Sequence, residues 1–223
     1  MKILAVTDIH DKYSIVDKMI EKENPDLLII GGDITTVGSV RDAETAIDRF
    51  VKSTKQVLAV AGNMDSALHE EVLLQKKVSL NARGVIINEI GFFGASASPI
   101  SPLNTPYEIS EEEIYSRISI AFLDVVDARY KILVSHAPPH GTKLDRIHSG
   151  LHVGSTAVWK VIDEKQPDIA ICGHIHEGTG IDKIGKTVVV NCGLAARGYY
   201  ALIIREENCF TVTNRNLLNQ PLD

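Results

Sequence analysis

Short apolar runs alternate with longer amphipathic segments through the first hundred residues, and this alternation constrains the fold more than any other feature of the chain. Residues 2–6, 27–30 and 57–61 form near-continuous apolar runs, as the buried strands of a parallel sheet do. Residues 14–23 and 42–52 carry apolar side chains at helical spacing, with charges on the opposite face. The order strand, helix, strand predicts βαβ units and therefore an α/β fold.

A hairpin pattern follows these units. Residues 85–87 and 92–94 flank a tight turn, which predicts an antiparallel hairpin and the start of a second sheet. Beyond it we expect two more buried strands, over 130–134 and 168–172, with a helix over 156–164 between them. The tail contains three strand-like runs, at 187–190, 199–204 and 209–213. Because no helical period separates these runs, they predict an antiparallel meander.

The segment 95–110 holds three prolines among serine, asparagine and threonine residues and predicts a surface loop. It could serve as a lid or as a plain connection, and we expect a connection because loops of this length are only sometimes functional. Ser110 followed by Glu113 forms a capping-box pattern that predicts the start of a helix. Trp159 lies on the apolar face of its expected helix and is assigned to the core.

Charge and cysteine content exclude several classes of protein. Lys and Arg total 23 against 29 Asp and Glu, and the formal net charge of -6 argues against a broad basic face for nucleic acid or anionic membrane. No apolar run approaches the ~18 residues of a membrane span, and Asp8 interrupts the first run too early for a signal peptide, so we expect a cytoplasmic protein. The three cysteines lack metal-ligand spacing and predict no disulfide framework, and Cys172 and Cys192 are expected to be buried thiols. The length of 223 residues fits one domain over residues 1–223.

Five motifs built from Asp, Asn, His and Gly follow the apolar runs. They are Asp8-Ile9-His10, Gly31-Gly32-Asp33, Gly62-Asn63-Met64-Asp65, Ser135-His136 and Gly173-His174-Ile175-His176. The carboxyl ends of strands in an open α/β sheet lie on one edge, where ligands bind, so we expect these side chains to converge. Each motif alone is weak, since an Asp at a strand end is usually a turn or cap residue. Turns have no need of imidazole, however, and four histidines in these positions indicate a functional site.

The residue types of these motifs suit a transition-metal centre. Carboxylate, imidazole and amide oxygen together favour Mn, Fe, Zn, Co or Ni, whereas thiolates alone would indicate structural zinc and oxygens alone would indicate Mg or Ca. The set is too large for one ion that keeps open positions, and it fits two ions that share a carboxylate. We therefore expect two divalent metal ions as cofactors, with Mn favoured.

The ordered combination of Asp-x-His, Gly-Asp, Gly-Asn-x-Asp, His and Gly-His-x-His over residues 8–176 resembles the calcineurin-like metallophosphoesterase superfamily. The resemblance implies a four-layer αββα sandwich of two mixed β-sheets flanked by helices, with a dinuclear metal centre at the sheet edge. It also implies that one ion is held by Asp8, His10, Asp33 and His176. The other ion would be held by Asp33, Asn63, His136 and His174, so that Asp33 bridges the two.

A centre of this kind points to phosphoester hydrolysis. Two divalent ions about 3.5 to 4 Å apart lower the pKa of a water held between them, and the resulting hydroxide can attack phosphorus in line. The same ions draw charge from the phosphoryl oxygens, so an acidic protein can still bind an anionic substrate. Together with the resemblance, this chemistry predicts hydrolysis of phosphodiester or phosphomonoester bonds in a small or nucleotide-type substrate.

The chain departs from the superfamily pattern directly after Asn63. Many members have a histidine there that acts near the leaving group, whereas this chain has Met64, whose thioether donates no proton. The change resembles a subgroup with Gly-Asn-x-Asp and leaves the proton donor open. The candidates are His140, in the turn after the fourth motif, Asp65 and His69. Asp65 could instead cap the helix that begins near Ser66, and His69 could be an exposed helical residue. Without a donor, substrates with good leaving groups, such as activated phosphodiesters, should react best.

Two other functions stay open at this point. The same fold could be a non-catalytic protein-interaction scaffold, similar to the retromer subunit that resembles these phosphoesterases, although a scaffold has no need of the full ligand set. A DNA nuclease could use the same centre, but the acidic charge and few aromatic residues offer no channel for a polyanion. The basic loop over 142–154 could contact substrate or be solvated. We expect a small phosphoester as the partner, neither membrane nor nucleic acid, and homo-oligomers are compatible with the sequence.

Overall fold

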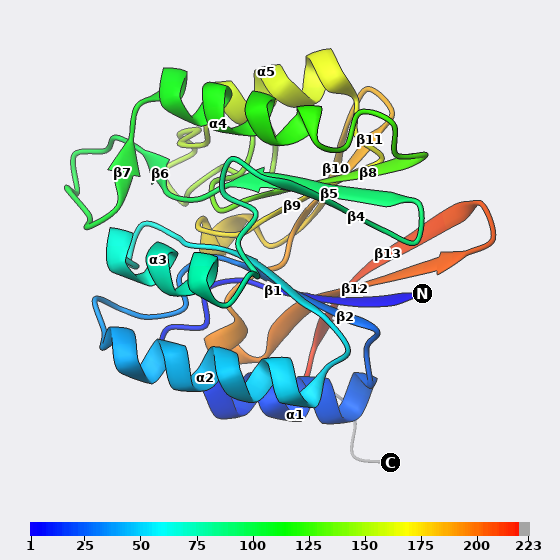
Figure 1. Ribbon diagram of the computed structural model, residues 1–223. Helices are drawn as coiled ribbons and strands as arrows, with labels where there is room; N and C mark the ends of the chain where they lie inside the picture. Colours follow the sequence, from blue (N-terminus) through cyan, green and yellow to red (C-terminus); the bar gives the residue numbers. More distant parts are fainter. Residues whose placement is uncertain (219–223) are drawn as a thin grey trace.

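Two β-sheets stack face to face in the computed structural model, which describes residues 1–218, and helices cover both outer faces (Figure 1). The first sheet has the strand order β13-β12-β1-β2-β3, and the second has the order β10-β11-β9-β8-β5-β4. Each sheet combines parallel and antiparallel pairs. This architecture confirms the expected four-layer sandwich of two mixed sheets.

The elements follow one another along the chain as short strands and medium-length helices. The first sheet comprises β1 (Lys2–Val6), β2 (Leu27–Gly31), β3 (Val57–Val60), β12 (Tyr199–Glu206) and β13 (Cys209–Asn216). The second comprises β4 (Gly84–Ile87), β5 (Ile90–Ala95), β8 (Tyr130–Ser135), β9 (Ile169–Cys172), β10 (Gly180–Ile184) and β11 (Thr187–Asn191). The helices are α1 (Tyr13–Glu23), α2 (Val40–Ser53), α3 (Ala67–Gln75), α4 (Glu111–Leu123) and α5 (Thr156–Lys165), with short 3-10 turns η1 (His176–Gly178) and η2 (Ala195–Arg197).

Alternation along the strands divides the core into three layers. In β1, Leu4 and Val6 pack with the buried faces of α1 and α2, while Ile3 and Ala5 face the second sheet. On the other side, α4 and α5 bury their apolar stripes against strands such as β8, where Leu133 belongs to that layer. Buried apolar surface on both faces of each sheet explains the near-continuous apolar runs in the sequence. The sandwich therefore holds its strand ends at fixed positions.

The predicted hairpin is confirmed, because β4 and β5 pair antiparallel at the edge of the second sheet. The predicted meander of the tail is wrong as a single unit. β10 and β11 pair antiparallel, but β11 pairs parallel with β9 in the second sheet. β12 and β13 pair with each other and join the first sheet beside β1. An apolar run indicates that a strand is buried but does not indicate which strand it pairs with. The sequence pattern therefore could not show that the chain changes sheets after β11.

The assignment of Trp159 to the core is also corrected, since 41% of this residue is exposed. α5 buries Ala157, Val158, Val161 and Ile162 against the second sheet, and Trp159 lies beside that stripe. Cys172 and Cys192 are buried free thiols, as expected. The Ser110 hydroxyl accepts a hydrogen bond from the Glu113 amide at 3.2 Å and caps α4 as the sequence predicts.

The segment 95–110 contains two short strands, β6 (Ser98–Pro99) and β7 (Glu108–Ile109), which pair with each other. The Glu108 carboxylate organises the loop, because it accepts hydrogen bonds from the amides of Ser101 and Thr105, both at 2.9 Å. Burial acts to raise the pKa of Glu108, but these hydrogen bonds outweigh it and lower the pKa to about 2. Within residues 1–218, no helix has the length and apolar character that crossing a membrane requires.

Candidate metal centre

Both sheets bring their polar strand ends to one edge of the sandwich. β1, β2 and β3 are parallel neighbours, and so are β5, β8 and β9. Backbone hydrogen bonds join adjacent ends: the Asp8 amide donates to the Gly32 carbonyl at 3.0 Å, and the Gly173 amide donates to the His136 carbonyl at 2.9 Å. The motifs at these ends therefore lie together, as the sequence predicts.

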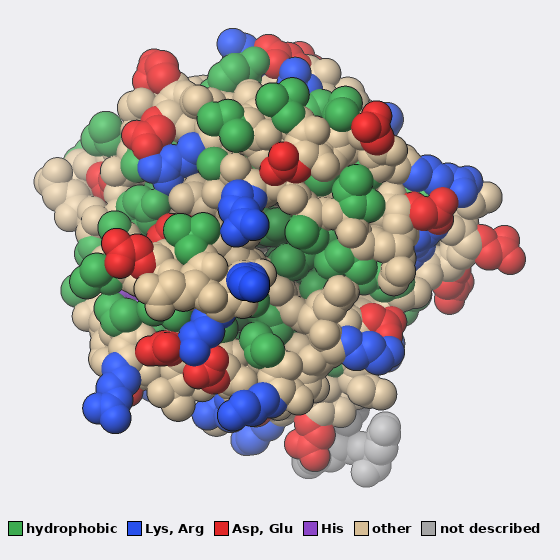
Figure 2. Space-filling view, viewed as in Figure 1, with side chains coloured by type: hydrophobic (Ala, Val, Ile, Leu, Met, Phe, Trp, Pro, Cys, Tyr) green, Lys and Arg blue, Asp and Glu red, His purple; other side chains and the backbone are tan. Residues whose placement is uncertain are grey.

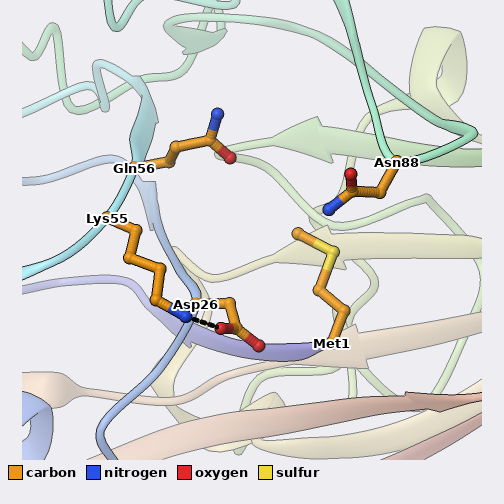
Figure 3. A pocket seen from close by; sticks show the side chains of 5 residues that line it. All are labelled: Met1, Asp26, Lys55, Gln56 and Asn88. Carbon is orange, nitrogen blue, oxygen red and sulfur yellow. Dashed lines mark hydrogen bonds and ion pairs between the residues drawn. The ribbon is translucent and has the colours of Figure 1, made fainter.

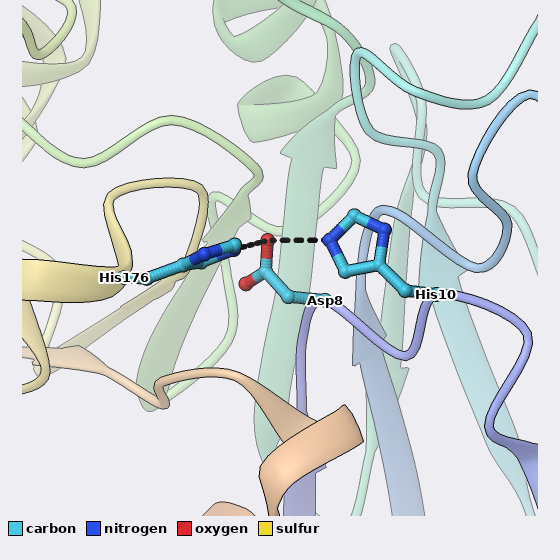
Figure 4. A group of neighbouring side chains, drawn as sticks. All are labelled: Asp8, His10 and His176. Carbon is cyan, nitrogen blue, oxygen red and sulfur yellow. Dashed lines mark hydrogen bonds and ion pairs between the residues drawn. The ribbon is translucent and has the colours of Figure 1, made fainter.

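Asp8, His10 and His176 form the first cluster (Figure 4). The two rings approach the same carboxylate oxygen from opposite sides, with Nε2 of His176 at 3.3 Å and Nε2 of His10 at 4.0 Å from Oδ1 of Asp8. One donor atom from each residue lies within 4.8 Å of the others. Asp8 comes from the first sheet and His176 from the second, so the cluster joins the two sheets.

Asp8, Asp33 and His136 form the second cluster. Oδ1 of Asp33 lies 3.4 Å from Nε2 of His136, and Oδ2 of Asp33 lies 3.7 Å from Nε2 of His10. The two oxygens of one carboxylate thus face histidines of different clusters. A carboxylate placed in this way can bridge two cations.

The surroundings of His136 test whether a cation fits. Nδ1 of this fully buried ring lies 2.9 Å from the carbonyl oxygen of Gly31, so Nδ1 carries a proton and donates it. Nε2 then directs its lone pair at Oδ1 of Asn63, 2.9 Å away, and at Oδ1 of Asp33. Three acceptor atoms that face one another repel unless a proton or a cation lies among them. The donor set therefore fits a borderline divalent metal ion.

His174 lies beside the second cluster without belonging to either group of converging donors. Its ring centroid is 5.0 Å from that of His136. Its backbone amide donates to both carboxylate oxygens of Asp8, at 3.3 and 3.1 Å. The structure thus brings all seven proposed ligands to one edge, with His174 also orienting Asp8 through its backbone.

The charges in the cluster shift several pKa values. Burial raises the pKa of Asp8, but its hydrogen bond with His176 and the charge on His136 outweigh burial and lower it to about 2. Burial lowers the pKa of His136, but the charge of Asp33 and its hydrogen bond raise it to about 9. Burial and the charge on His136 lower the pKa of His174 to about 4. The hydrogen bond to Asp8 raises the pKa of His176. The carboxylates thus favour the charged forms of His136 and His176, whereas His174 favours its neutral form.

Backbone strain and close approach mark this edge. Four of the proposed ligands have left-handed backbone angles, with φ of 57° at Asp8, 45° at His10, 50° at Asp33 and 67° at His174. Non-glycine residues adopt such angles rarely, and they cluster at functional sites. A Cβ atom at Gly62 would lie 2.2 Å from Oδ1 of Asp33, so this motif glycine is required by the approach of the carboxylate.

The candidate proton donors occupy different surroundings. Asp65 is fully buried and accepts hydrogen bonds from the amides of Ile34, Thr35 and Gly62 at 2.8 to 3.1 Å. Burial and the neighbouring charge of Asp33 raise the pKa of Asp65. The carboxylate thus ties the second motif to the third. The helix that follows is capped by Ser66, not by Asp65.

His69 is buried, which corrects the alternative that it is an exposed helical residue. Its Nδ1 accepts a hydrogen bond from the Ser66 amide at 3.0 Å and completes the cap of α3. His140 is half-exposed, and its Nδ1 lies 3.6 Å from Oδ2 of the buried Asp145. Of the three candidates, His140 is therefore the one whose imidazole reaches solvent beside a carboxylate.

Sequence reasoning did not find two residues that support the cluster. The Thr36 hydroxyl lies 2.8 Å from Nδ1 of His10 and orients that ring. Asn191 is fully buried at the end of β11, beside the turn that carries His174 and His176. A signal for Asn191 is present in the sequence, since Asn191-Cys192-Gly193 follows an apolar run as the five motifs do.

A cavity of about 530 Å³ lies at the opposite edge of the sandwich (Figure 3). Met1, Asp26, Lys55, Gln56 and Asn88 line it, and Lys55 pairs with Asp26 at 2.5 Å. These residues lie at the amino ends of the strands, away from the converging motifs. On the face shown in Figure 2, acidic and basic side chains are interspersed and form no continuous basic stripe.

The chain is similar to known proteins over most of its length. The family model for calcineurin-like phosphoesterases matches residues 1–178. A Methanocaldococcus jannaschii protein, MJ1162, is 37% identical over 198 residues, which cover 86% of this chain and 87% of the relative.

Two solved structures are similar in fold. The crystal structure of TT1561 of Thermus thermophilus has a TM-score of 0.72 at 16% identity and covers 96% of this chain and 98% of its own. A dimetal phosphatase from Danio rerio has a TM-score of 0.61 at 12% identity, with coverage of 97% and 96%.

Proposed function

Because the chain belongs to the calcineurin-like phosphoesterase family, we propose that it is a dinuclear metal-dependent phosphohydrolase that acts on a small phosphoester. The observation that carries this proposal is the placement of Asp33, whose two carboxylate oxygens face His136 and His10 in separate clusters. A non-catalytic scaffold has no need of a carboxylate shared in this way between two groups of donors.

The proposed ligand sets extend the two clusters with Asn63 and His174, and they share Asp33 in place of Asp8. Asp8, His10, Asp33 and His176 would hold one ion, and Asp33, Asn63, His136 and His174 would hold the other. Bound there, two divalent ions, preferentially Mn²⁺, would activate water for attack on phosphorus and take up charge from the phosphoryl oxygens. The protein's own part is orientation: the Gly31 carbonyl fixes the ring of His136, and the Thr36 hydroxyl fixes the ring of His10.

We assign protonation of the leaving group to His140. The alternative donor, Asp65, already accepts three backbone hydrogen bonds, and we propose that it positions the second and third motifs instead. Asp145, which is fully buried, lies beside Nδ1 of His140 and can orient the ring. A proton held there can pass to a departing alkoxide.

The surroundings of the third motif favour substrates with good leaving groups. Met64 follows Asn63 and offers no proton, while its backbone amide donates to Oδ1 of Asp33 at 2.8 Å. Protonation then rests on His140 alone, which penalises alkoxide leaving groups, since they need a proton, more than aryl leaving groups. We therefore propose that activated phosphodiesters are hydrolysed faster than alkyl phosphomonoesters.

The test combines metal analysis with turnover. Protein stripped of metal is reconstituted with Mn²⁺, Fe²⁺, Co²⁺, Ni²⁺, Zn²⁺ or Mg²⁺, and hydrolysis of bis-p-nitrophenyl phosphate is compared with that of a simple alkyl phosphomonoester. We expect two equivalents of metal and faster turnover of the diester. Asp33→Asn should lose metal and reduce turnover about a thousandfold. Asp26→Asn, at the cavity of Figure 3, should change neither and serves as the control.

Three outcomes would contradict the proposal in different ways. Retention of two ions without hydrolysis of any phosphoester would favour the scaffold. A clear preference for the alkyl monoester would remove the proposed substrate class while leaving the enzyme. A salt-dependent gel shift with single-stranded DNA would favour the nuclease.

We also propose that residues 1–223 act as one catalytic domain. The family model ends at residue 178, but β12 from the tail completes the first sheet beside β1. Backbone hydrogen bonds also join the tail to the centre, since the amide of Ala196 donates to the carbonyl of Asp8 at 3.2 Å.

A further inference from the structure

Asn191 ends β11 directly beside the strand that leads to His174 and His176. In the parallel register of the two strands it lies opposite Cys172, the last residue of β9. Its side chain is fully buried, and its hydrogen bonds go to the backbone of Leu144, Gly173, Ile175 and Gly193. A buried carboxamide in this position needs hydrogen-bond partners, and it finds them in the backbone of the ligand turn.

The amide nitrogen of Asn191 contacts three carbonyl oxygens. Nδ2 donates to the carbonyl of Ile175 at 2.9 Å, of Leu144 at 3.2 Å and of Gly173 at 3.3 Å. Gly173 and Ile175 flank His174, so one side chain holds the backbone on both sides of that residue. Leu144 belongs to the loop that follows His136, so the same side chain also joins this loop to the ligand turn.

The oxygen of Asn191 extends the connection toward Asp8. Oδ1 accepts a hydrogen bond from the Gly193 amide at 3.0 Å, and the Gly193 carbonyl in turn accepts one from the Thr7 hydroxyl, also at 3.0 Å. Thr7 precedes Asp8, the residue shared by both clusters. The Asn191 side chain therefore fixes the backbone on both sides of His174 through Nδ2, and through Oδ1 it holds Gly193, which hydrogen-bonds to the residue before Asp8.

The turn from Gly173 to His176 is also held through its amides, because the Gly173 amide donates to the His136 carbonyl at 2.9 Å and the His174 amide donates to Asp8. His174 is held at a φ of 67°, and a Cβ atom at Gly173 would lie 2.4 Å from Oδ2 of Asp8, so the turn is pressed against the carboxylate in a strained conformation. Such a conformation persists only when surrounding contacts impose it. The carboxamide of Asn191 supplies contacts at both ends of the strained residue.

We propose that Asn191 is a positioning residue of the metal centre, and that its carboxamide holds the turn so that His174 and His176 face Asp8. The inference rests on the proposed function only to the extent that the site binds metal. Groups that orient ligands in this way usually contribute ten- to a hundredfold to metal affinity.

The experiment compares two apolar replacements on the same strand. Asn191→Leu removes the carboxamide with little change in volume, and Thr187→Val removes a buried hydroxyl at the other end of β11, where it donates to the Pro167 carbonyl at 2.6 Å. Each variant is titrated with Co²⁺, whose visible absorption bands report on coordination geometry. Hydrogen exchange of the amides of residues 173–178 is followed in the metal-free protein.

Asn191→Leu should weaken binding of one of the two Co²⁺ equivalents about ten- to a hundredfold, alter the absorption bands and accelerate amide exchange in residues 173–178. Thr187→Val should leave all three readouts as in the unchanged protein. If Asn191→Leu does not fold, Asn191→Ala, which removes the same groups without adding bulk, carries the same expectation.

Unchanged bands, affinities and exchange in a folded Asn191 variant would overturn the proposal, and so would equal losses in Thr187→Val. Failure of the proposed function looks different, because it requires the unchanged protein to bind two ions and hydrolyse no phosphoester. Amide exchange reports on Asn191 even then, since it needs neither metal nor substrate.

Discussion

Nε2 of His136 lies 2.9 Å from Oδ1 of Asn63, while Nδ1 of the same ring is committed to the Gly31 carbonyl. The charge of Asp33 outweighs burial and raises the pKa of His136 to about 9, so without metal we expect a proton on Nε2 between ring and amide. A cation bound among these atoms takes the place of that proton. Metal binding and protonation of His136 are therefore mutually exclusive.

Binding of metal should release a proton from His136. Asp8 and His174, with pKa values of about 2 and about 4, are already deprotonated near neutral pH and release none. The affinity for this ion should rise about tenfold per pH unit and level off above the His136 pKa of about 9. Calorimetric titration in two buffers of different ionisation enthalpy counts the protons. An affinity that does not change between about pH 7 and pH 9 would contradict the expectation.

The same proton should stabilise the metal-free fold. The pKa of His136 rises from 6.5 to about 9 on folding, so its contribution is complete below pH 6.5 and is lost as the pH rises through about 9. A shift of this size corresponds to about 3 kcal/mol in the free energy of unfolding. Asp8 acts in the opposite sense, since its contribution is present above pH 3.8 and is lost only as the pH falls through about 2.

Urea denaturation of the metal-free protein across this range measures the effect. We expect its free energy of unfolding to fall between pH 6.5 and about 9, and that of the metal-loaded protein to stay level there, because the bound ion has already displaced the proton. His136→Gln supplies the control, since it removes the titrating ring and should flatten the metal-free profile.

The sequence predicts well that the ligand side chains converge, because a residue that follows a parallel strand lies at the carboxyl edge of the sheet. Asp8, Asp33 and His136 each come directly after a buried run, and parallel strands bring such residues to one edge whatever their order in the sheet. The composition of the motifs then narrows the chemistry to metal binding. Neither step needs a knowledge of which strands are neighbours.

It is harder to infer from the sequence which distant strands pair and which side chains hold the metal ligands in place. The change of sheet after Asn191 depends on which edge the chain reaches next, and no local pattern encodes that. Trp159 fits the helical period as well as Val158 does, but only one stripe of α5 meets the sheet. Asn191 follows an apolar run as the five motifs do, but its role emerges only when the carbonyls around its carboxamide are known.

Gly62→Ala should disrupt metal binding by displacing the carboxylate of Asp33, although it replaces none of the proposed ligands. The added Cβ atom would lie 2.2 Å from Oδ1 and 2.3 Å from the amide nitrogen of Asp33, so the carboxylate must move. Gly141→Ala is the matched control, because its Cβ atom meets nothing within 4 Å, although its φ of 79° makes the substitution cost about 1 kcal/mol or more in stability. Metal analysis should find loss of bound ion in Gly62→Ala only. Equal metal content in the two variants would show that Asp33 tolerates the displacement.

His140→Asn should slow alkyl substrates selectively if His140 protonates the leaving group. Alkoxides need a proton to depart, whereas p-nitrophenolate leaves as an anion, so kcat should fall about a hundredfold for an alkyl ester and change little for bis-p-nitrophenyl phosphate. KM should stay unchanged for both. His152→Asn is the control, since His152 contacts the same buried Asp145, with Nδ1 at 2.8 Å, but is not proposed to donate. Equal losses on both substrates, or the same selectivity in His152→Asn, would show that the loop around Asp145 acts through its shape and not through a proton held on His140.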